Sequence, residues 1–420
     1  MKKLLLVSAV AASTLMASGY KIPEQSLNST ALAGAYVSNT SAADAAYYNP
    51  ANMAFMSSKR HLEVNAMYAH LNPVEFTGKI YDPNDTNPAP LPQATTSESS
   101  SEDFIIPQIY IVGAPIGEDE DIRLGLSVNA PAGLSKRWPE GIESAYAEEF
   151  SLTVIEVNPT LSYRIMDNLA IAGGVRFIYS HGVIKANTTD RPGLAQGALD
   201  MEASSWDVGY NLALSYSPLD MWGMALTYRS NVDMTVEGGA QTGLQEAMFD
   251  PTMPDTLPGS TSLPLPAVLT IATDVDVTDS TNIEFVYERT FWSAYEELSI
   301  EVPNMGVTMT SAKDWEDSNT IRLGLTQGLG ESLNLMLGFA YDQTPIPDSA
   351  LSFDLPDSDA MIGSVGLRWA VNEEVDLGAA VLYDVKAERT VAAADNDKAI
   401  DGTFSGSGAV LVSFGLGYKF

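Results

Sequence analysis

Residues 206–216 read WDVGYNLALSY, and every second side chain in this stretch is large and apolar or aromatic. The side chains between them are small or polar. A β-strand places successive side chains on opposite faces, so the pattern predicts a strand with one bulky apolar face and one small or polar face. In a soluble sandwich the apolar face is the core, whereas in a membrane barrel it contacts lipid and the polar face lines the lumen.

The same alternation recurs in residues 169–180, 333–342, 375–386 and 410–420, with exceptions such as Leu382. Two details favour the membrane barrel. Aromatic residues cluster near the strand ends, which suits the girdles of an outer-membrane barrel. Arginines recur on the polar face, where an inward network could pair them with acidic residues; they are Arg123, Arg164, Arg176, Arg322 and Arg368.

The spacing of the strands gives an independent argument. The pattern predicts strands at about 60–72, 103–114, 121–131, 150–165, 169–183, 203–217, 221–237, 265–277, 281–293, 317–327, 332–343, 359–370, 375–390 and 408–420. Short turns such as Met166–Asn168 alternate with long segments such as 73–102 and 238–264. Short periplasmic turns, longer outer loops and an even strand number are typical of bacterial barrels. The predicted fold is therefore all-β, a transmembrane antiparallel β-barrel of about 14 strands over residues 59–420.

The N-terminus predicts export. A basic start at Met1-Lys2-Lys3 is followed by a short apolar run and then by small residues at Ala17 to Gly19, which is the layout of a secretory signal. We expect residues 1–18 to be that signal peptide. The absence of cysteine fits passage through an oxidising periplasm, although weakly. A net charge of -32 argues against nucleic acid as a partner, because phosphates would be repelled.

Residues 19–58 lack the two-residue alternation and are rich in Ala, Ser and Asn. The segment is too short for an independent domain. A barrel of about 14 strands is too wide for its own side chains to fill, so the segment is predicted to plug the lumen as a hatch. Its candidate hatch residues are Tyr20, Tyr47, Tyr48, Asn49, Pro50 and Ala51.

Several motifs resemble the FadL family of outer-membrane transporters of long-chain fatty acids and other hydrophobic compounds. Gly19 to Ser26, Gly34 to Tyr36 and Asp44 to Ala51 resemble its N-terminal hatch, with Asn49-Pro50-Ala51 the most specific element. Gly125 to Leu134, with Trp138 just beyond, resembles its third strand and the following loop. The resemblance implies a plugged 14-stranded barrel that captures hydrophobic ligand among its outer loops, binds it in a pocket beside the hatch and releases it sideways through a kinked third strand.

Three residues in this chain are candidates for that kink: Asn129, Pro131 and Gly133. Proline and glycine interrupt or weaken ladder pairing. The alternative is that they simply end the strand at its loop. At the other end of the chain, Tyr418 and Phe420 close an alternating strand, which resembles the C-terminal signal read by the outer-membrane barrel assembly machinery.

A fatty acid carboxylate requires a cation or several amide donors. Lys136 and Arg137 lie in the predicted second outer loop, and Lys185 and Arg191 lie at and beyond the top of the fifth strand. Lys185 is the first choice, and the alternative is that it is a solvated loop lysine. Because the outer loops are acidic, neutral hydrocarbons and aromatic compounds remain open as ligands.

Other function classes fit less well. The three histidines, His61, His70 and His181, stand in no nucleophile-elbow or zinc pattern, so we expect no enzyme, no cofactor and no metal. The acidic loop at Asp395 to Asp401 lacks the Gly and Glu spacing of an EF-hand. A general diffusion porin is the alternative transporter, but it would not need an N-terminal plug. We expect a monomer in the outer membrane of a Gram-negative-type bacterium, with hydrophobic ligand, membrane lipid, lipopolysaccharide and the assembly machinery as partners and no nucleic acid.

Overall fold

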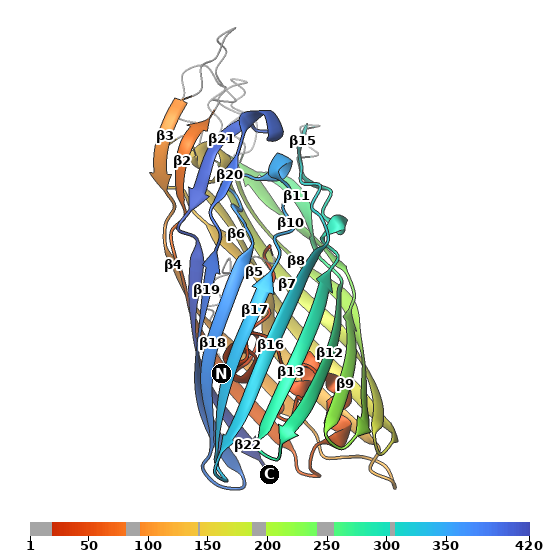
Figure 1. Cartoon of the computed structure of the whole chain (residues 1–420). Coiled ribbons are helices and arrows are strands. Elements are labelled where there is room, and N and C mark those ends of the chain that lie inside the picture. The colour runs from red at the N-terminus through yellow and green to blue at the C-terminus, as the bar shows by residue number, and fades with distance from the viewer. Residues whose placement is uncertain (1–18, 81–92, 142, 187–198, 242–255, 303–306) are drawn as a thin grey trace, which may run out of the picture.

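The computed structural model describes residues 19–80, 93–141, 143–186, 199–241, 256–302 and 307–420. Within these residues, fourteen antiparallel strands form a closed ring, because β1 pairs with β4 on one side and with β22 on the other. The strands are tilted against the barrel axis (Figure 1). In ring order they are β1 (His61–Leu71), β4 (Glu102–Val112), β5 (Ile122–Lys136), β6 (Glu149–Met166), β7 (Leu169–Ala186), β8 (Leu199–Leu219), β9 (Trp222–Arg229), β12 (Val268–Thr278), β13 (Thr281–Thr290), β16 (Ser318–Leu329), β17 (Leu333–Asp342), β18 (Ala360–Ala370), β19 (Val375–Lys386) and β22 (Gly408–Lys419).

The two faces of the wall have opposite character. Outward side chains are large and apolar, and Trp206 on β8 is 70% exposed. Inward side chains include Arg123, Arg176 and Arg322, each nearly completely buried in the lumen. A soluble fold would bury the apolar face, so this inverted arrangement is that of a barrel whose outer surface contacts lipid. The predicted fold class is confirmed, and three of the five arginines predicted on the polar face are buried in the lumen.

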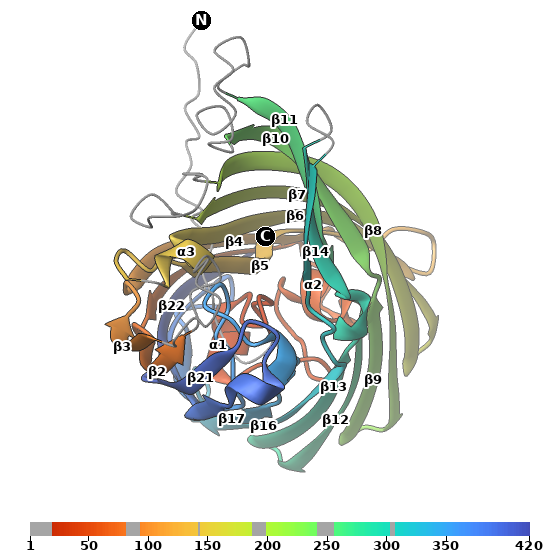
Figure 2. The same ribbon diagram turned by 90° about the horizontal axis from the view of Figure 1, so that it is seen from above.

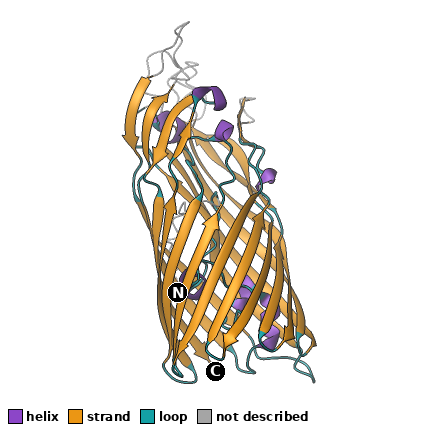
Figure 3. Cartoon of the chain, viewed as in Figure 1, coloured by secondary structure: helices purple, strands orange, loops and turns teal. Residues whose placement is uncertain are grey.

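The connections differ at the two ends, and we call the end with the long connections the outer end (Figure 3). There, β10 (Val232–Gln241), β11 (Leu257–Leu265), β14 (Glu297–Val302) and β15 (Val307–Ala312) extend the wall upward. A separate four-stranded sheet is formed by β2 (Glu75–Ile80), β3 (Gln93–Glu98), β20 (Arg389–Val391) and β21 (Ile400–Ser405). The outer end also carries α3 (Ser144–Ala147), η2 (Trp292–Ala294), η4 (Asp348–Ala350) and η5 (Ala393–Asp395). No helix in the described part of the chain is long and apolar enough to cross a membrane.

The prediction of one strand at 221–237 is wrong. The strand breaks after Arg229, and β10 then continues along the upper part of β8. The amide N–H of Ser230 donates to the carbonyl of Tyr210 at the break (2.9 Å). An alternating pattern cannot reveal this break, because both pieces keep the same period.

The hatch occupies the lumen. It contains α1 (Leu27–Ala31), α2 (Ala45–Tyr48) and η1 (Pro50–Phe55), and Figure 2 shows α1 and α2 inside the ring of strands. Close packing depends on small residues on both sides: a Cβ added to Gly366 would lie 2.4 Å from the Cβ of Ala31. Asn49 organises the centre of the hatch, because its side chain accepts from the N–H of Ala51 (3.2 Å) and donates to the carbonyl of Val37 (2.9 Å). Pro50 fits the first helical position, where no N–H is needed.

Candidate ligand-binding site

A pocket beside the hatch combines apolar and cationic walls. Its apolar lining comes from Ile22, Pro23, Val37, Pro131, Leu265, Pro266 and Val268. Tyr47 and Tyr48 of the hatch also line it. Its charged lining is Lys21, Arg176, Arg229, Arg322 and Glu288. The pocket thus lies between the start of the hatch and a wall of β7, β9, β12, β13 and β16.

Two ion networks hold these cations. In the first, Glu156 on β6 binds Arg176 (2.8 Å) and Arg229, and Arg176 also donates to the carbonyl of Ser230 (2.7 Å). The guanidinium of Arg229 lies 4.3 Å from the ring centroid of Tyr47, which is a cation–π contact. The wall therefore fixes the position of a hatch aromatic ring.

In the second network, Glu288 on β13 binds Lys21 of the hatch and, at 3.4 Å, Arg322 of β16. Lys21 also donates to the hydroxyl of Thr290 (3.0 Å). Arg322 donates to the carbonyl of Ala33 (3.1 Å) and lies 3.7 Å from Glu24. Both hatch and wall thus contribute charges to this side of the pocket.

Four cations and one carboxylate, Glu288, line the pocket, and Glu24, Glu156 and Asp342 act on the arginines from behind the lining. The lining itself therefore carries more positive than negative side chains, in a chain whose net charge is -32. A cationic surplus in a buried space attracts an anionic group. The apolar residues around it would suit the rest of a long hydrophobic molecule.

A second pocket lies at the outer ends of β6, β7, β8, β10 and β11 and is almost entirely apolar. Its lining is Phe150, Ser151, Leu152, Gly182, Ile184, Met201, Ala203, Val236, Thr261 and Leu263. Leu263 lines this outer pocket, and Leu265, two residues along the same strand, lines the pocket beside the hatch. Strand β11 therefore connects the two pockets.

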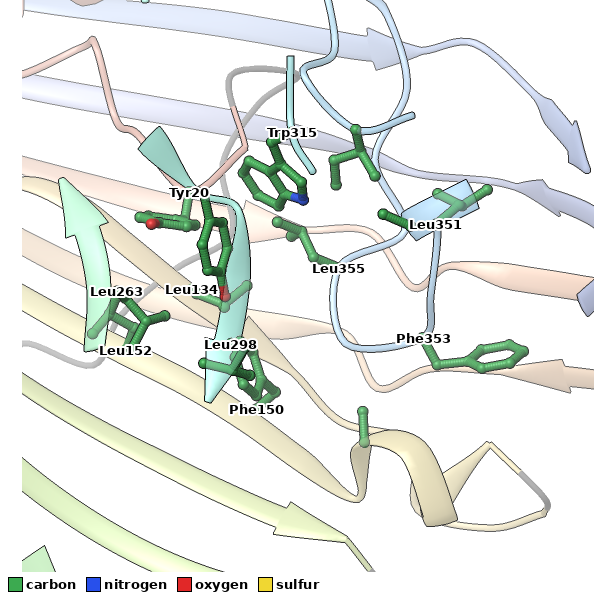
Figure 4. Packing of buried hydrophobic residues seen from close by; sticks show 14 of the residues in the cluster. Tyr20, Leu134, Phe150, Leu152, Leu263, Leu298, Trp315, Leu351, Phe353 and Leu355 are labelled. Atoms are coloured by element: carbon green, nitrogen blue, oxygen red, sulfur yellow. The ribbon is translucent and has the colours of Figure 1, made fainter. Parts of the chain in front are cut away.

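Tyr20 of the hatch lies between the two pockets. Its hydroxyl donates to the carbonyl of Pro264 on β11, and its ring packs edge-on against Trp292, with 4.7 Å between centroids. Figure 4 shows Tyr20 in the same apolar cluster as Leu134, Leu152, Leu263 and Trp315. Apolar contact is thus continuous from the outer pocket to the hatch.

Strand β5 leaves its neighbour β4 part-way up the wall. The two strands pair only between Gly125 and Val128, whereas β5 stays with β6 up to Lys136. The β5–β6 register shifts between Asn129 and Ala132, which is a β-bulge that contains Pro131. Residues Glu102 to Gln108 of β4 have no β5 partner in the described structure. We call the resulting interval in the wall the window.

The window is bounded by named contacts. Below it lies the Ile109–Val128 pair, and above it the N–H of Ser100 donates to the carbonyl of Arg137 (2.9 Å) while the Arg137 side chain binds Glu102. Its lumen side carries an apolar cluster that includes Ile22, Phe104, Ile106 and Ala130. Ile22 also lines the pocket beside the hatch, so apolar surface reaches from that pocket to the window.

Comparisons with known proteins agree with this architecture. A family model described as "Outer membrane protein transport protein (OMPP1/FadL/TodX)" matches residues 8–420. The chain belongs to this family. The long-chain fatty acid transport protein of Escherichia coli O6:H1 is 24% identical over 334 residues, which cover 71% of this chain and 74% of that protein.

Two solved structures share the fold. A FadL homologue from Pseudomonas aeruginosa has a TM-score of 0.83 at 19% identity, with 96% of this chain and 100% of that chain covered. The toluene transporter TodX of Pseudomonas putida has a TM-score of 0.69 at 14% identity, with 96% and 99% covered. The resemblance drawn from the sequence is confirmed. The protein is a FadL-family transporter of the outer membrane and not an enzyme.

Within this FadL-family fold, three of the four cations chosen from the sequence are described, and these three, Lys136, Arg137 and Lys185, lie at the outer end and do not line the pocket beside the hatch. Arg137 binds Glu102 and Glu149, and Lys185 binds Glu149 at 3.4 Å. Lys136 is buried and donates to the hydroxyl of Ser99 (3.2 Å). Burial lowers the pKa of Lys136 to about 8, with Lys386 adding to the effect and Glu102 opposing it. Arg191 lies outside the described residues.

The other chosen residues are distributed as follows. Tyr20, Asn49, Pro50 and Ala51 are buried in the lumen, and Tyr47 and Tyr48 line the pocket. Strand β5 runs past Asn129, Pro131 and Gly133 to Lys136, so these residues do not end it. At the inner end Tyr418 and Phe420 stack on each other (5.3 Å between centroids), exposed on the outer face of the wall. The predicted signal peptide, residues 1–18, lies outside the described residues.

Sequence reasoning missed the cations that do line the pocket. Arg176 and Arg322 were placed on the inward face but were not considered as ligand contacts. Lys21 and Arg229 were not singled out. The inward position of an arginine on an alternating strand could have indicated the three arginines, because it distinguishes lumen arginines from loop lysines. Lys21 precedes the first strand, so the alternation does not indicate it. Among the described residues, no group of three His, Asp or Glu side chains is arranged to hold a metal ion.

Proposed function

We propose that this FadL-family protein takes up long-chain fatty acids through the outer membrane by outer capture, binding beside the hatch and lateral release. The observation that carries the proposal is the position of the cationic pocket, which lies between two stretches of apolar surface. One stretch leads from the outer pocket past Tyr20, and the other leads by Ile22 to the window.

Capture follows from the chemistry of the outer pocket. An apolar chain gains free energy on leaving water in proportion to the apolar area that it buries, at about 25 cal/mol per Å². The lining of Leu152, Ile184, Met201 and Leu263 offers such surface with almost no competing polar group. Lys185 and Arg137 lie near this end of β5 to β7 and would meet a carboxylate during entry.

Binding beside the hatch would place the carboxylate among Lys21, Arg176, Arg229 and Arg322 and the chain along Leu265 and Val268. The carboxylate would offset the local positive surplus, and each charge-assisted hydrogen bond contributes about 1.5–3 kcal/mol. Because Lys21, Ile22 and Pro23 belong to the hatch, an occupied pocket acts directly on the segment that faces the window.

Lateral release keeps the molecule in apolar surroundings. A hydrophobic solute gains nothing from a watery route into the periplasm, whereas the window leads toward the lipid-facing wall. The break at Asn129 and Pro131 and the apolar cluster at Phe104, Ile106 and Ala130 support this route.

A neutral ligand is the second candidate. The fold is shared with a toluene transporter, and the outer pocket has no charged residue in its lining. A monoaromatic compound would use the same apolar surfaces and leave the cations unused. We further propose a monomer surrounded by outer-membrane lipid and lipopolysaccharide, and assembly through a signal at Tyr418 and Phe420, which lie exposed at the end of the last strand.

The test compares ligands across a matched pair of variants. Cells without their own transporter express the wild type, Lys21→Met or Lys185→Met, and uptake of radiolabelled oleate and toluene is measured. Glu288 keeps Arg322 as a partner in Lys21→Met, so that substitution leaves no unpaired carboxylate. We expect oleate uptake to fall about tenfold in Lys21→Met with toluene unchanged, the effect of losing one charge-assisted bond. Lys185→Met should change oleate uptake less.

Two outcomes would count against the proposal. If Lys21→Met lowers uptake of neither compound while toluene uptake is saturable in the wild type, the neutral ligand is the correct one. If neither compound enters saturably and small sugars pass freely through the wild-type protein, the protein is a porin.

A further inference from the structure

The first residues of the hatch run beside the part of β5 at and above the bulge, in the manner of a short strand. Lys21 forms a β-bridge with Ala132, the N–H of Ile22 donates to the carbonyl of Pro131 (2.8 Å), and the N–H of Gly133 donates to the carbonyl of Tyr20 (2.9 Å). Above the bulge, β5 is therefore paired with β6 along one edge and with the hatch along the edge that faces away from β6.

One hatch side chain extends this pairing. The amide nitrogen of Gln25 donates to the carbonyl of Ala130 (2.8 Å), and its amide oxygen accepts from the N–H of Ala130 (3.0 Å). The same nitrogen donates to the carbonyl of Ile22 (3.0 Å). A glutamine amide carries the same donor and acceptor as a peptide unit. Gln25 thus gives Ala130 both hydrogen bonds that a residue on a neighbouring strand would give.

Strand β4 cannot supply those bonds equally well. Extending the register of Ile109 opposite Val128 by two residues places Pro107 opposite Ala130. Proline has no N–H to donate. Strands β1 and β4 pair without interruption through Pro107, so the face on which a donor is missing is the one toward β5. Gln25 provides a donor at the level where β4 lacks one.

We infer that Gln25 is the positioning residue that holds β5 away from β4 and so keeps the window open. The inference rests on the proposed lateral release. Gln25 follows directly on the pocket residues Lys21, Ile22 and Pro23, so it links the occupied pocket to the strand that borders the exit. Without its amide, β5 loses two of its hydrogen bonds to the hatch, so the competing arrangement in which β5 pairs with β4 becomes less unfavourable.

A disulfide trap tests the position of β5. The chain has no cysteine, so introduced pairs react without competition. Phe104→Cys and Gly133→Cys face each other if the β4–β5 register continues upward. A bond between them requires Cα atoms within about 7 Å. The pair is placed in the wild-type background, in Gln25→Met and in Asn52→Leu.

Gln25→Met keeps the length of the side chain and removes both hydrogen-bonding groups. Asn52→Leu is the matched control. Asn52 also makes bonds within the hatch, to Ser38 (2.7 Å) and Thr40 (2.8 Å), and its bond to the wall in the described structure is with Ser215 of β8 rather than with β5. We expect the oxidised yield to rise several-fold in Gln25→Met alone. An unchanged yield, or an equal rise in both variants, would overturn the inference.

Oleate uptake by the same single variants, without the cysteines, separates the inference from the proposed function. We expect uptake to fall on the order of tenfold in Gln25→Met, as a shift of the open–closed equilibrium by about one hydrogen bond would give. A raised disulfide yield with unchanged uptake would support the positioning role of Gln25 and reject lateral release. A fall in uptake with an unchanged yield would reject the positioning role.

Discussion

The outer chamber and the hatch–wall interface lie in one barrel but are held together by different forces. The outer chamber is mainly an aromatic and aliphatic cluster in which Trp138, Trp292 and Phe353 are completely buried, although the buried ion pair of Lys313 and Asp354 lies beside it. The hatch–wall interface is a set of directional bonds. Glu284 on β13 accepts from the backbone N–H groups of Val37 and Ser38 (2.6 Å each) and of Asn39 (3.2 Å), all three in the hatch.

The difference explains where a ligand can pass. Apolar contact is non-directional, so a fatty acid chain can replace one apolar neighbour by another at little cost. A buried network of charged hydrogen bonds has one good arrangement, and breaking it leaves unpaired groups. The proposed route accordingly follows apolar surface and touches the ionic networks only at the pocket beside the hatch.

The largest effect is expected from removing the side chain of Glu284, whose hydrogen bonds hold the hatch to the wall. Glu284→Ala removes the acceptor of the buried N–H groups of Val37 and Ser38, each of which costs about 1–3 kcal/mol when unsatisfied, and of the N–H of the exposed Asn39, which water can reach. We expect the hatch to loosen by about 2–6 kcal/mol and the barrel to leak small sugars in a liposome-swelling assay. The control is Glu297→Ala, at an exposed carboxylate of β14. Equal leakage from both variants would show that Glu284 does not hold the hatch.

A slightly smaller effect is expected from breaking the aromatic cluster. Trp138 is completely buried, packs against Phe353 at 5.2 Å between centroids and donates to its carbonyl (2.8 Å). Truncation of a buried tryptophan costs about 3–5 kcal/mol. In Trp138→Ala we expect faster proteolysis of the outer loops and no sugar leakage.

The control for this variant is Trp206→Ala, at a tryptophan that is 70% exposed on the lipid-facing wall. It should leave proteolysis of the outer loops unchanged. Sugar leakage from Trp138→Ala would contradict the distinction between the two regions, because the bonds that hold the hatch in the lumen would then depend on the packing of the outer chamber.

The same contrast separates what the sequence could and could not predict. The alternation at residues 206–216 and at 410–420 is sufficient to predict the strands of the wall, because the large apolar side chains of each strand show which face contacts lipid. All fourteen ring strands were anticipated, although β9 and β10 were merged. The sequence predicts loops where β2, β3 and β21 form most of the outer sheet, since short strands that pair across long sequence distances leave no periodic signal.

The candidate site was harder to predict for a physical reason. Whether an inward arginine contacts ligand depends on which hatch residue packs opposite it. The residues that neighbour Arg229 and Lys21 in the sequence do not indicate this packing. Lys136 and Lys185 are predicted as ligand contacts from their position at or after the end of a strand. This position places a residue at the outer end of the barrel but does not place it in the pocket. The hatch motif at Asn49 was specific because one side chain satisfies several backbone groups there.

A moderate effect is expected from placing a charge in the outer pocket. Leu152 is buried in its lining, and an aspartate there would have to lose its hydration without a partner. We expect Leu152→Asp to lower uptake of oleate and toluene alike, on the order of tenfold or more, if both ligands enter through this pocket. Thr235→Asp on the exposed face of β10 is the control. Loss of oleate uptake alone would mean that toluene enters elsewhere.

The smallest effect is expected from removing a charge that already lies in the outer chamber. Lys136 is buried there, and its pKa of about 8 lies below the value of about 10.4 in an unfolded chain. The folded state therefore favours the neutral amine. The penalty is complete below pH 8, declines as the pH rises from about 8 to about 10.4, and is gone above that. From these two pKa values the penalty is about 3 kcal/mol, and loss of the hydrogen bond to Ser99 offsets about 1 kcal/mol of it. Lys136→Met should therefore abolish this dependence and stabilise the outer loops at pH 7 by about 2 kcal/mol or less.

Protease resistance of the outer loops at pH 7 and pH 10 measures both claims. In the wild type resistance should rise with pH, whereas in Lys136→Met the two values should be equal and no lower than the wild-type value at pH 7. Destabilisation at pH 7 would show that the bond to Ser99 and the attraction of Glu102 outweigh burial. The charge of Lys136 would then stabilise the outer chamber as charges stabilise the hatch–wall interface, and the distinction between the two regions would fail at this residue.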